Sequence, residues 1–518
     1  MKMKRFLLCL LLCSLLLGTV SVFVSCENKG EGTTKAGDGL PAENIPDDNV
    51  RNWYEIFLYS FADSDGDGIG DFRGATEKLE YVRDMGFNGI WLMPVMPSPS
   101  YHKYDITNYM TVDYVYGTME DFRAFMNRAH ELGIKVILDL VVNHTSDRHA
   151  WFRSACEGES SPYREYYNFS DTRLDGYTQV PGKSDYYESR FVSNMPDLNL
   201  DSPRVREEIA NIMRFWFDEG VDGFRLDAVT SYYTNQISKN VAFLSWLSDT
   251  ARTMRPDCYI VGEAWADRSV IRGYYGSTAD SFFYFPGSQG SGDFARIVSE
   301  DATARGRKYA DFITGVEAFY GTDKLMAYFL DNHDTDRITQ SVGAWDLPRL
   351  KALYGMLSMM RGGIYVYYGD EIGMLGKTND PNRRIGMLWD KKENTTTPPP
   401  GANVTNYYLP GVADQQQDAN SLLLYVRRAM KYRLAFPEIA RGSTTILPSA
   451  DPDLCLIRRE WNGSAVTLVL NLSDSAKIVT LGEGTLVGAL DADLGTGDGV
   501  ACTDGVLTMD AWAIAILN

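Results

Sequence analysis

From Trp53 onward, short apolar segments alternate with amphipathic segments, and this alternation limits the folds open to the chain. The first apolar segment, WYEIFLYSF, reads as a strand, and the segment after it carries Leu79, Val82 and Met85 at helical spacing. Seven more apolar segments follow in order: GFNGIWLMP, IKVILDLVVNH, VDGFRLD, YIVGEAW, DSFFYF, KLMAYFLDNHD and GGIYVYYGDEIGM. Eight strands separated by helices predict an α/β fold, a closed (β/α)8 barrel, with an open doubly wound sheet as the alternative.

Two regions depart from this rhythm. Residues 145–203 are rich in Tyr, Ser and Asp and show no regular alternation, which predicts an inserted lobe, domain B, after the third strand. Residues 437–518 contain short alternating runs such as AVTLVLNL, separated by Gly, Asp and Ser, which predict a small C-terminal antiparallel β domain. The barrel is therefore expected to comprise residues 49–144 and 204–436.

The N-terminus has the form of an export signal, with a basic start, an apolar run from Phe6 to Leu17 and small residues before Cys26. A membrane anchor is the alternative, but the run is shorter than the about 20 residues that span a bilayer. Cys26 resembles the lipidated cysteine of bacterial lipoproteins. We expect a signal peptide over 1–26 with lipidated Cys26, a linker over 27–48, and an outer-membrane or cell-surface lipoprotein, or otherwise a periplasmic or secreted protein.

The formal net charge of -19 argues against nucleic acid and anionic lipid headgroups as partners, because both would be repelled. Membrane association is therefore expected only through the lipid anchor. No CxxC spacing is present, so the sequence predicts neither a zinc site nor a redox motif. Four cysteines beyond the N-terminal segment are expected to be core thiols, with one disulfide as the alternative: Cys156, Cys258, Cys455 and Cys502.

Charged residues lie at the ends of several predicted strands, where barrel enzymes place their sites. Alternation in VDGFRLD puts Arg225 and Asp227 on the inward face, and such a pairing would keep the acid ionised and nucleophilic. Glu263 ends the fifth strand and Asp334 follows the seventh. Each acid alone could cap a helix or lie at the surface. Three that meet at one barrel mouth predict glycoside hydrolysis.

Four segments resemble, in the correct order, the signature regions of the α-amylase family of retaining glycoside hydrolases. These are DLVVNH (139–144), GFRLDAV (223–229), GEAW (262–265) and FLDNHD (329–334), while MPDLN (195–199) resembles the fifth region of that family. The resemblance covers about residues 50–436 and implies a barrel followed by a β-sandwich domain.

The resemblance implies roles for individual residues. Asp227 matches the nucleophile, Glu263 the general acid/base, and Asp334 the third carboxylate, which binds sugar hydroxyls. Arg225 matches the residue that orients the nucleophile. The other residues implied to lie around the same sugar are His102, Tyr104, Asp105, His144 and His333.

The segment DSDGDGIGD (63–71) places aspartates at alternate positions. An EF-hand is excluded because its twelfth loop position, which requires Glu, is Gly74. A plain acidic turn is the alternative, but clustered carboxylates repel one another without a cation, and hard oxygens suit Ca²⁺. The segment also resembles the calcium loop of oligoglucosidase-like family members, which implies one structural Ca²⁺ held by Asp63, Asp65, Asp67, the Ile69 carbonyl and Asp71.

A second Ca²⁺, between barrel and lobe, is not expected, because Thr230 and Ser231 replace a histidine ligand found in many α-amylases. The residue after the nucleophile is Ala228, whereas oligo-1,6-glucosidases tend to have Val, so we expect α-1,4 cleavage. The segment MPDLN is intermediate between subfamilies and leaves some α-1,6 activity open. The predicted function is endo-hydrolysis of starch and maltooligosaccharides, with surface starch-binding proteins as further partners. The alternatives are an exo-acting α-glucosidase, a cyclomaltodextrinase or neopullulanase, a transglycosylase, and a non-catalytic glycan-binding protein.

Overall fold

The computed structural model describes residues 40–299, 301–343, 346–390, 396–403, 409–481, 484–492 and 499–518. The predicted signal peptide, Cys26 and residues 27–39 of the predicted linker lie outside the described residues. Within the described part of the chain, no helix has both the length and the apolar character needed to cross a bilayer. The four cysteines in it are free thiols, of which Cys258 and Cys455 are buried.

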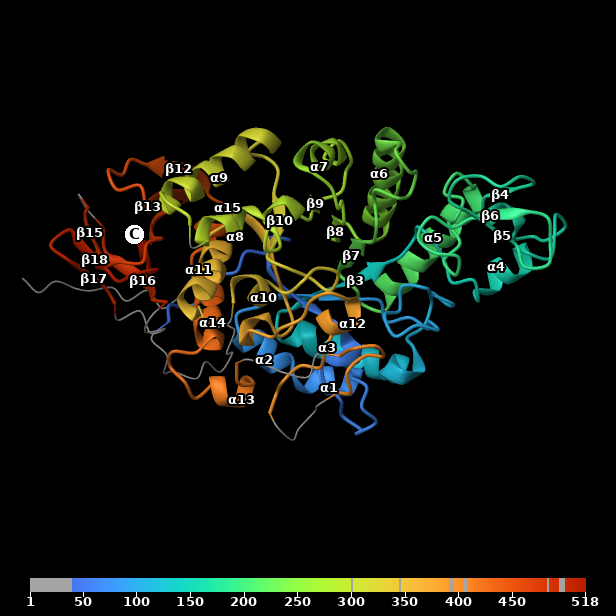
Figure 1. The fold of residues 1–518 in the computed structure, drawn as a ribbon, viewed down its shortest axis with the longest axis horizontal. Coiled ribbons are helices and arrows are strands. Elements are labelled where there is room, and N and C mark those ends of the chain that lie inside the picture. Colours follow the sequence, from blue (N-terminus) through green and yellow to red (C-terminus); the bar gives the residue numbers. More distant parts are fainter. Residues whose placement is uncertain are drawn as a thin grey trace, which may run out of the picture. The chain divides into compact units, whose positions relative to one another are not determined.

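Eight parallel strands form one sheet (Figure 1), in the order β10-β11-β1-β2-β3-β7-β8-β9. The strands are β1 (Asn52–Ile56), β2 (Gly89–Leu92), β3 (Lys135–Leu140), β7 (Gly223–Leu226), β8 (Tyr259–Gly262), β9 (Ser281–Phe282), β10 (Met326–Phe329) and β11 (Gly362–Tyr367). A single parallel bridge between Phe283 and Ala327 joins the two end strands. The predicted (β/α)8 barrel is confirmed.

Helices follow the strands and bury their apolar faces. In α3 (Met119–Glu131) the buried residues include Phe122, Phe125 and Met126, and the side chain of Thr118 caps the first turn. The first predicted helix is instead two short ones, α1 (Phe72–Glu77) and α2 (Leu79–Asp84). The remaining helices around the barrel are α5 (Pro203–Asp218), α6 (Ile237–Met254), α7 (Arg268–Tyr274), α8 (Asp293–Val298), α9 (Arg305–Tyr320), α10 (Ile338–Val342), α11 (Leu347–Ser358), α12 (Asp380–Arg383), α13 (Val412–Gln415), α14 (Leu422–Ala435) and α15 (Pro437–Arg441).

Aromatic side chains fill the barrel interior. Trp53 stacks on Tyr259 and Tyr365, with ring centroids 5.2 and 5.8 Å apart. Gly89 makes room for this indole, because a Cβ at that position would lie 2.5 Å from the Trp53 ring. The apolar layer consists of Trp53, Trp91, Ile137, Tyr259, Val261, Phe283, Phe285, Ala327, Phe329 and Tyr365. The barrel is thus a packed core and not a pore.

The segment after β3 forms a lobe of α4 (Ala150–Ala155) and a small antiparallel sheet, drawn in turquoise and green in Figure 1. Its strands are β4 (Phe169–Ser170), β5 (Tyr177–Gln179) and β6 (Tyr186–Glu188). The lobe lies within the predicted boundaries 145–203 and ends where α5 begins.

The C-terminal region contains two antiparallel sheets, in the orders β12-β13-β14-β19-β16 and β15-β18-β17. Their strands are β12 (Ser443–Leu447), β13 (Leu454–Trp461), β14 (Ser464–Asn471), β15 (Lys477–Thr480), β16 (Leu486–Leu490), β17 (Val500–Thr503), β18 (Val506–Met509) and β19 (Ile514–Leu517). At the other end of the described chain, residues 40–48 of the predicted linker contact the barrel region: Glu43 pairs with Arg83, and Asp48 with Arg441.

Candidate active site

The inward-facing residues of the barrel change from apolar to charged toward the C-terminal strand ends. On β1, Trp53 is followed two positions later by Glu55, and on β8, Val261 is followed by Glu263. Residues two apart in a strand share a face, so the charged groups lie directly above the apolar layer. Glu55, Asp139 and Glu263 are all buried. Such burial is tolerated only where the charges are paired.

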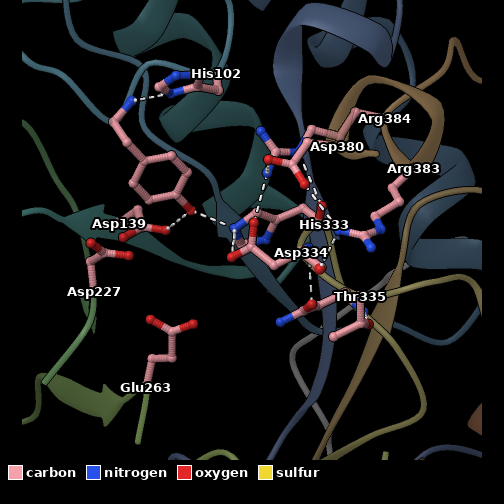
Figure 2. Close-up of polar contacts among 12 residues, drawn as sticks. His102, Asp139, Asp227, Glu263, His333, Asp334, Thr335, Asp380, Arg383 and Arg384 are labelled. Atoms are coloured by element: carbon pink, nitrogen blue, oxygen red, sulfur yellow. Dashed lines mark hydrogen bonds and ion pairs between the residues drawn. The ribbon is translucent and has the colours of Figure 1, made fainter. Parts of the chain in front are cut away.

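Arg225 is the cation that pairs with these acids. Its Nη1 lies 2.7 Å from Asp227 Oδ1 and 2.8 Å from Asp139 Oδ1, and its Nη2 lies 3.1 Å from Glu263 Oε2. One planar guanidinium therefore holds Asp227 and Glu263 together. Figure 2 shows these two carboxyl groups turned toward the same space, with Asp334 on its other side.

Asp227 and Glu263 occupy different electrostatic environments. Burial, reinforced by the charges of Asp227 and Asp334, raises the pKa of Glu263 to about 8, although Arg225 acts in the opposite direction. Glu263 Oε2 also accepts a 2.8 Å hydrogen bond from the Ala228 N–H. Ala228 has a φ of +46°, a left-handed conformation that costs a non-glycine residue about 1 kcal/mol. The site thus contains a carboxyl group that stays protonated at neutral pH, the property a general acid needs.

Asp334 is held from two sides. Its Oδ2 lies 3.0 Å from His333 Nε2, and its Oδ1 accepts a 2.7 Å bond from Arg384 Nη2. Burial disfavours the ionised carboxylate, but the neighbouring cations hold the pKa of Asp334 well below its usual range. Burial likewise opposes the charged form of His333, yet Asp334 and Glu55 raise its pKa to about 9. Asp334 is therefore an ionised acceptor in a fixed orientation.

The remaining predicted residues line the same mouth. Tyr104 donates to Asp139 Oδ2 at 2.9 Å, and its ring stacks on His333 at 5.6 Å. His144 is buried, which lowers its pKa, and its Nε2 has no hydrogen-bond partner among the described residues. His102 Nδ1 accepts the Tyr104 N–H at 3.1 Å.

Asp105 has a supporting position. Its Oδ1 accepts a 2.5 Å hydrogen bond from Ser98 Oγ and a further one from Ser100 Oγ. The carboxylate therefore ties together the loop that carries Tyr104.

Two residues of the site were missed by the sequence analysis, Glu55 and Arg384. Glu55 had a usable signal, since it is a single acid inside the apolar strand WYEIFLYSF, where burial of an unpaired charge would be costly. Arg384 had none, because it lies in a loop 50 positions after Asp334.

The acidic loop brings together three of its four predicted carboxylate ligands. Side-chain oxygens of Asp63, Asp65 and Asp71 lie within 4.8 Å of one another, which makes this a candidate metal cluster among the described residues. Asp67 does not belong to the cluster; instead, its Oδ1 accepts the Ile69 N–H at 2.7 Å. Asp71 also caps α1 by accepting the Gly74 N–H.

Residues 55–442 match the family model for the alpha amylase catalytic domain. The chain belongs to the α-amylase family. It is 36% identical to Alpha-amylase 3 of Dictyoglomus thermophilum over 433 residues, which cover 81% of this chain and 84% of that protein. It is 29% identical to an oligo-1,6-glucosidase of Heyndrickxia coagulans over 520 residues, covering 82% and 91%.

The solved structure of Eubacterium rectale Amy13B is 40% identical, with a TM-score of 0.87, and the match covers 92% of this chain and 97% of that one. The protein is thus a glycoside hydrolase of the α-amylase family, with a TIM-type barrel and C-terminal antiparallel sheets.

Proposed function

We propose that this glycoside hydrolase cleaves α-1,4-glucosidic bonds within starch and maltooligosaccharides, with retention of anomeric configuration. The observation that carries the proposal is the pairing of Asp227 and Glu263 on the single guanidinium of Arg225. Retaining glycosidases need two carboxyl groups flanking one glycosidic bond, one ionised and one protonated.

The reaction proceeds in two displacements. Glu263 donates its proton to the glycosidic oxygen while Asp227 attacks the anomeric carbon, so the leaving chain departs and a glycosyl ester forms on Asp227. Glu263, now a carboxylate, removes a proton from water, which attacks the same carbon and releases Asp227. Arg225 holds the Asp227 carboxyl group in place through the 2.7 Å contact to Oδ1, so that it faces the oxocarbenium-like transition state between these steps.

Two groups are placed to bind hydroxyls of the reacting sugar. Asp334 offers a carboxylate held by His333 and Arg384. His144 offers a buried Nε2 that lacks a partner among the described residues, and a sugar hydroxyl would satisfy it. These contacts would strengthen as the ring distorts toward the transition state.

The linkage preference rests on Ala228 and on the relatives. The similarity is higher to a protein named Alpha-amylase 3, at 36% identity, than to an oligo-1,6-glucosidase, at 29%. That second relative makes α-1,6 cleavage or exo-action the rival candidate. Chromatography of products from soluble starch, pullulan and maltotriose separates the two. Mixed maltooligosaccharides from starch support endo-cleavage, whereas glucose released alone from chain ends would contradict it.

We further propose that the acidic loop binds one structural Ca²⁺. The support is the chemistry of the donor set, because Asp63, Asp65 and Asp71 converge their hard oxygens at the start of α1. Bound Ca²⁺ would hold the loop against charge repulsion, so chelation should lower the Tm by several degrees and added Ca²⁺ should restore it. An unchanged melting curve with no metal in elemental analysis would argue against the site.

Finally, we propose export as a lipoprotein, outer-membrane or cell-surface, through residues 1–26, with acyl transfer to Cys26 and surface starch-binding proteins as neighbours. The support is the basic, apolar and small-residue pattern of this segment. Metabolic labelling with a radioactive fatty acid should mark the wild-type protein and leave Cys26→Ser unlabelled. Equal labelling of both would contradict the anchor.

A further inference from the structure

Glu55 is a buried carboxyl group for which the mechanism above has no role. It lies on the inward face of β1, between Trp91 of β2 and Tyr367 of β11 in the register of the sheet. Its side chain is 1% exposed. A carboxyl group at such a position must have a compensating partner.

The partner is His333. Glu55 Oε1 lies 2.5 Å from His333 Nδ1, on the opposite side of the ring from the sugar-binding groups. The other ring nitrogen, Nε2, lies 3.0 Å from Asp334 Oδ2 and 2.7 Å from the Tyr104 hydroxyl. The imidazole of His333 therefore bridges Glu55 to Asp334.

The hydrogen-bond network fixes which ring nitrogens are linked through protons. Asp139 accepts Arg225 Nη1 through both oxygens, so it acts as an acceptor for Tyr104, which donates its single hydroxyl proton there. Tyr104 must then accept from His333, which places a proton on Nε2. Without a proton between Nδ1 and Glu55 Oε1, two lone pairs would face each other at 2.5 Å, so that contact also contains one.

We propose that Glu55 is a positioning residue of this active site, whose carboxyl group shares a proton with His333 Nδ1 and so fixes the ring orientation of His333 and the proton on its Nε2, which faces Tyr104 and Asp334. A neutral imidazole without a partner at Nδ1 can carry its proton on either nitrogen. With the proton on Nδ1, the Nε2 lone pair would face the Asp334 carboxylate and the Tyr104 oxygen. Asp334 would then lose one of its two anchors.

The surroundings of His333 support this assignment. The charged and polar groups around the ring are Glu55 from β1, Asp334 beside it, and the Tyr104 hydroxyl, while Trp91 packs against the ring with centroids 5.5 Å apart. Although burial acts against a charged ring, the two carboxylates raise the pKa of His333 to about 9. Glu55 therefore also favours the ring form in which both nitrogens donate.

The test compares two substitutions of matched length. In Glu55→Gln, the side-chain amide can donate to Nδ1 and keep the proton on Nε2, so kcat should stay within about threefold of wild type. In Glu55→Met, the side chain fills similar space but offers no strong hydrogen bond, so kcat should fall by about tenfold to a hundredfold. A role in packing alone would leave Met at least as active as Gln. Equal kcat for wild type and Glu55→Met, or equal losses for Met and Gln, would overturn the proposal.

Glu55→Asp provides a second test in case Glu55→Met fails to fold. Its carboxylate is one methylene shorter and cannot make the 2.5 Å contact with Nδ1 in the same backbone position, so kcat should fall while the Tm stays close to wild type. Wild-type kcat in Glu55→Asp would also count against the inference.

The inference rests on the proposed sugar-binding role of Asp334, which His333 helps to hold, and the assays use whichever α-glucoside the wild-type protein hydrolyses. If starch is not the substrate, the wild-type protein itself will fail to hydrolyse it. Failure of the role of Glu55 would show only in the ratios between variants.

Discussion

The barrel contains two adjacent layers of inward-facing side chains with opposite chemistry. The lower layer is apolar and aromatic, with Trp53 stacked on Tyr259 and on Tyr365. The upper layer, two residues further along the same strands, contains charged groups joined through Arg225. Along these strands, the inward face thus changes from apolar core to active site between one inward-facing residue and the next.

The difference between the layers shows how a packed core prepares catalytic chemistry. The aromatic layer excludes water from below, so the carboxyl groups above it are desolvated and their electrostatic interactions strengthen. Burial is the main cause of the raised pKa of Glu263. Each layer therefore makes separate predictions. Substitutions in the charged layer should change turnover or the stability of its ion pairs, whereas substitutions in the aromatic layer should act on stability and only indirectly on the chemistry.

The largest effect is expected from Asp227→Asn in the charged layer. It removes the nucleophile while preserving shape, so kcat on starch should fall by roughly 10⁴-fold or more. Starch binding, measured by affinity electrophoresis, and the Tm should change little. Turnover within tenfold of wild type would remove the assignment of Asp227.

Arg225→Met should make the charged layer unstable. The substitution leaves Asp139, Asp227 and Glu263 without their shared cation, and removal of one partner from a buried ion pair costs about 3–5 kcal/mol. Urea unfolding near pH 7 should show the loss. Lowering the pH should recover part of it, because Asp139, whose pKa burial already raises to about 7, can then be protonated, whereas a loss that grew as pH fell would contradict this account.

Trp53→Leu tests the aromatic layer and should lower stability far more than turnover. It opens a cavity in the aromatic layer and should lower the free energy of unfolding by about 2–4 kcal/mol. The kcat of the folded protein, measured well below its Tm, should stay within about fivefold of wild type. Trp53→Phe, which keeps a ring, should lose less stability. A large fall in kcat with intact stability would show that the lower layer acts directly on the chemistry.

The smallest effect concerns pH. Because the pKa of Glu263 is raised to about 8, kcat/KM should hold below that pH and fall as the pH rises through it and the acid loses its proton. Val261→Thr places a hydroxyl in the layer beneath and should move this alkaline limb to lower pH by about half a unit, through weaker desolvation. If the alkaline limb of the pH profile did not move, the raised pKa of Glu263 would be due to the charges of Asp227 and Asp334 and not to desolvation by the layer beneath.

The barrel fold and much of the candidate site could be predicted from sequence because they depend on residues that are close together in the chain. Alternation in VDGFRLD placed Arg225 and Asp227 on one face, and the structure has Arg225 Nη1 2.7 Å from Asp227 Oδ1. The contact between Glu55 and His333 could not be predicted in this way, since it joins residues 278 positions apart and exists only once β1 and β10 lie in one closed barrel. The two environments of Asp227 and Glu263 likewise depend on which side chains surround them after folding.

The backbone pairing between β9 and β10 is the sparsest in the barrel sheet. Between β9 and β10 the backbone pairing is the isolated bridge from Phe283 to Ala327, whereas β1 and β2 pair over a run that includes Trp53 to Gly89 and Ile56 to Leu92. Local opening starts where the fewest backbone hydrogen bonds must break. Amide protons of β9 and β10 should therefore exchange with deuterium before those of β1. The barrel would then open locally between β9 and β10 while the strands that carry Glu55 and Arg225 stay paired.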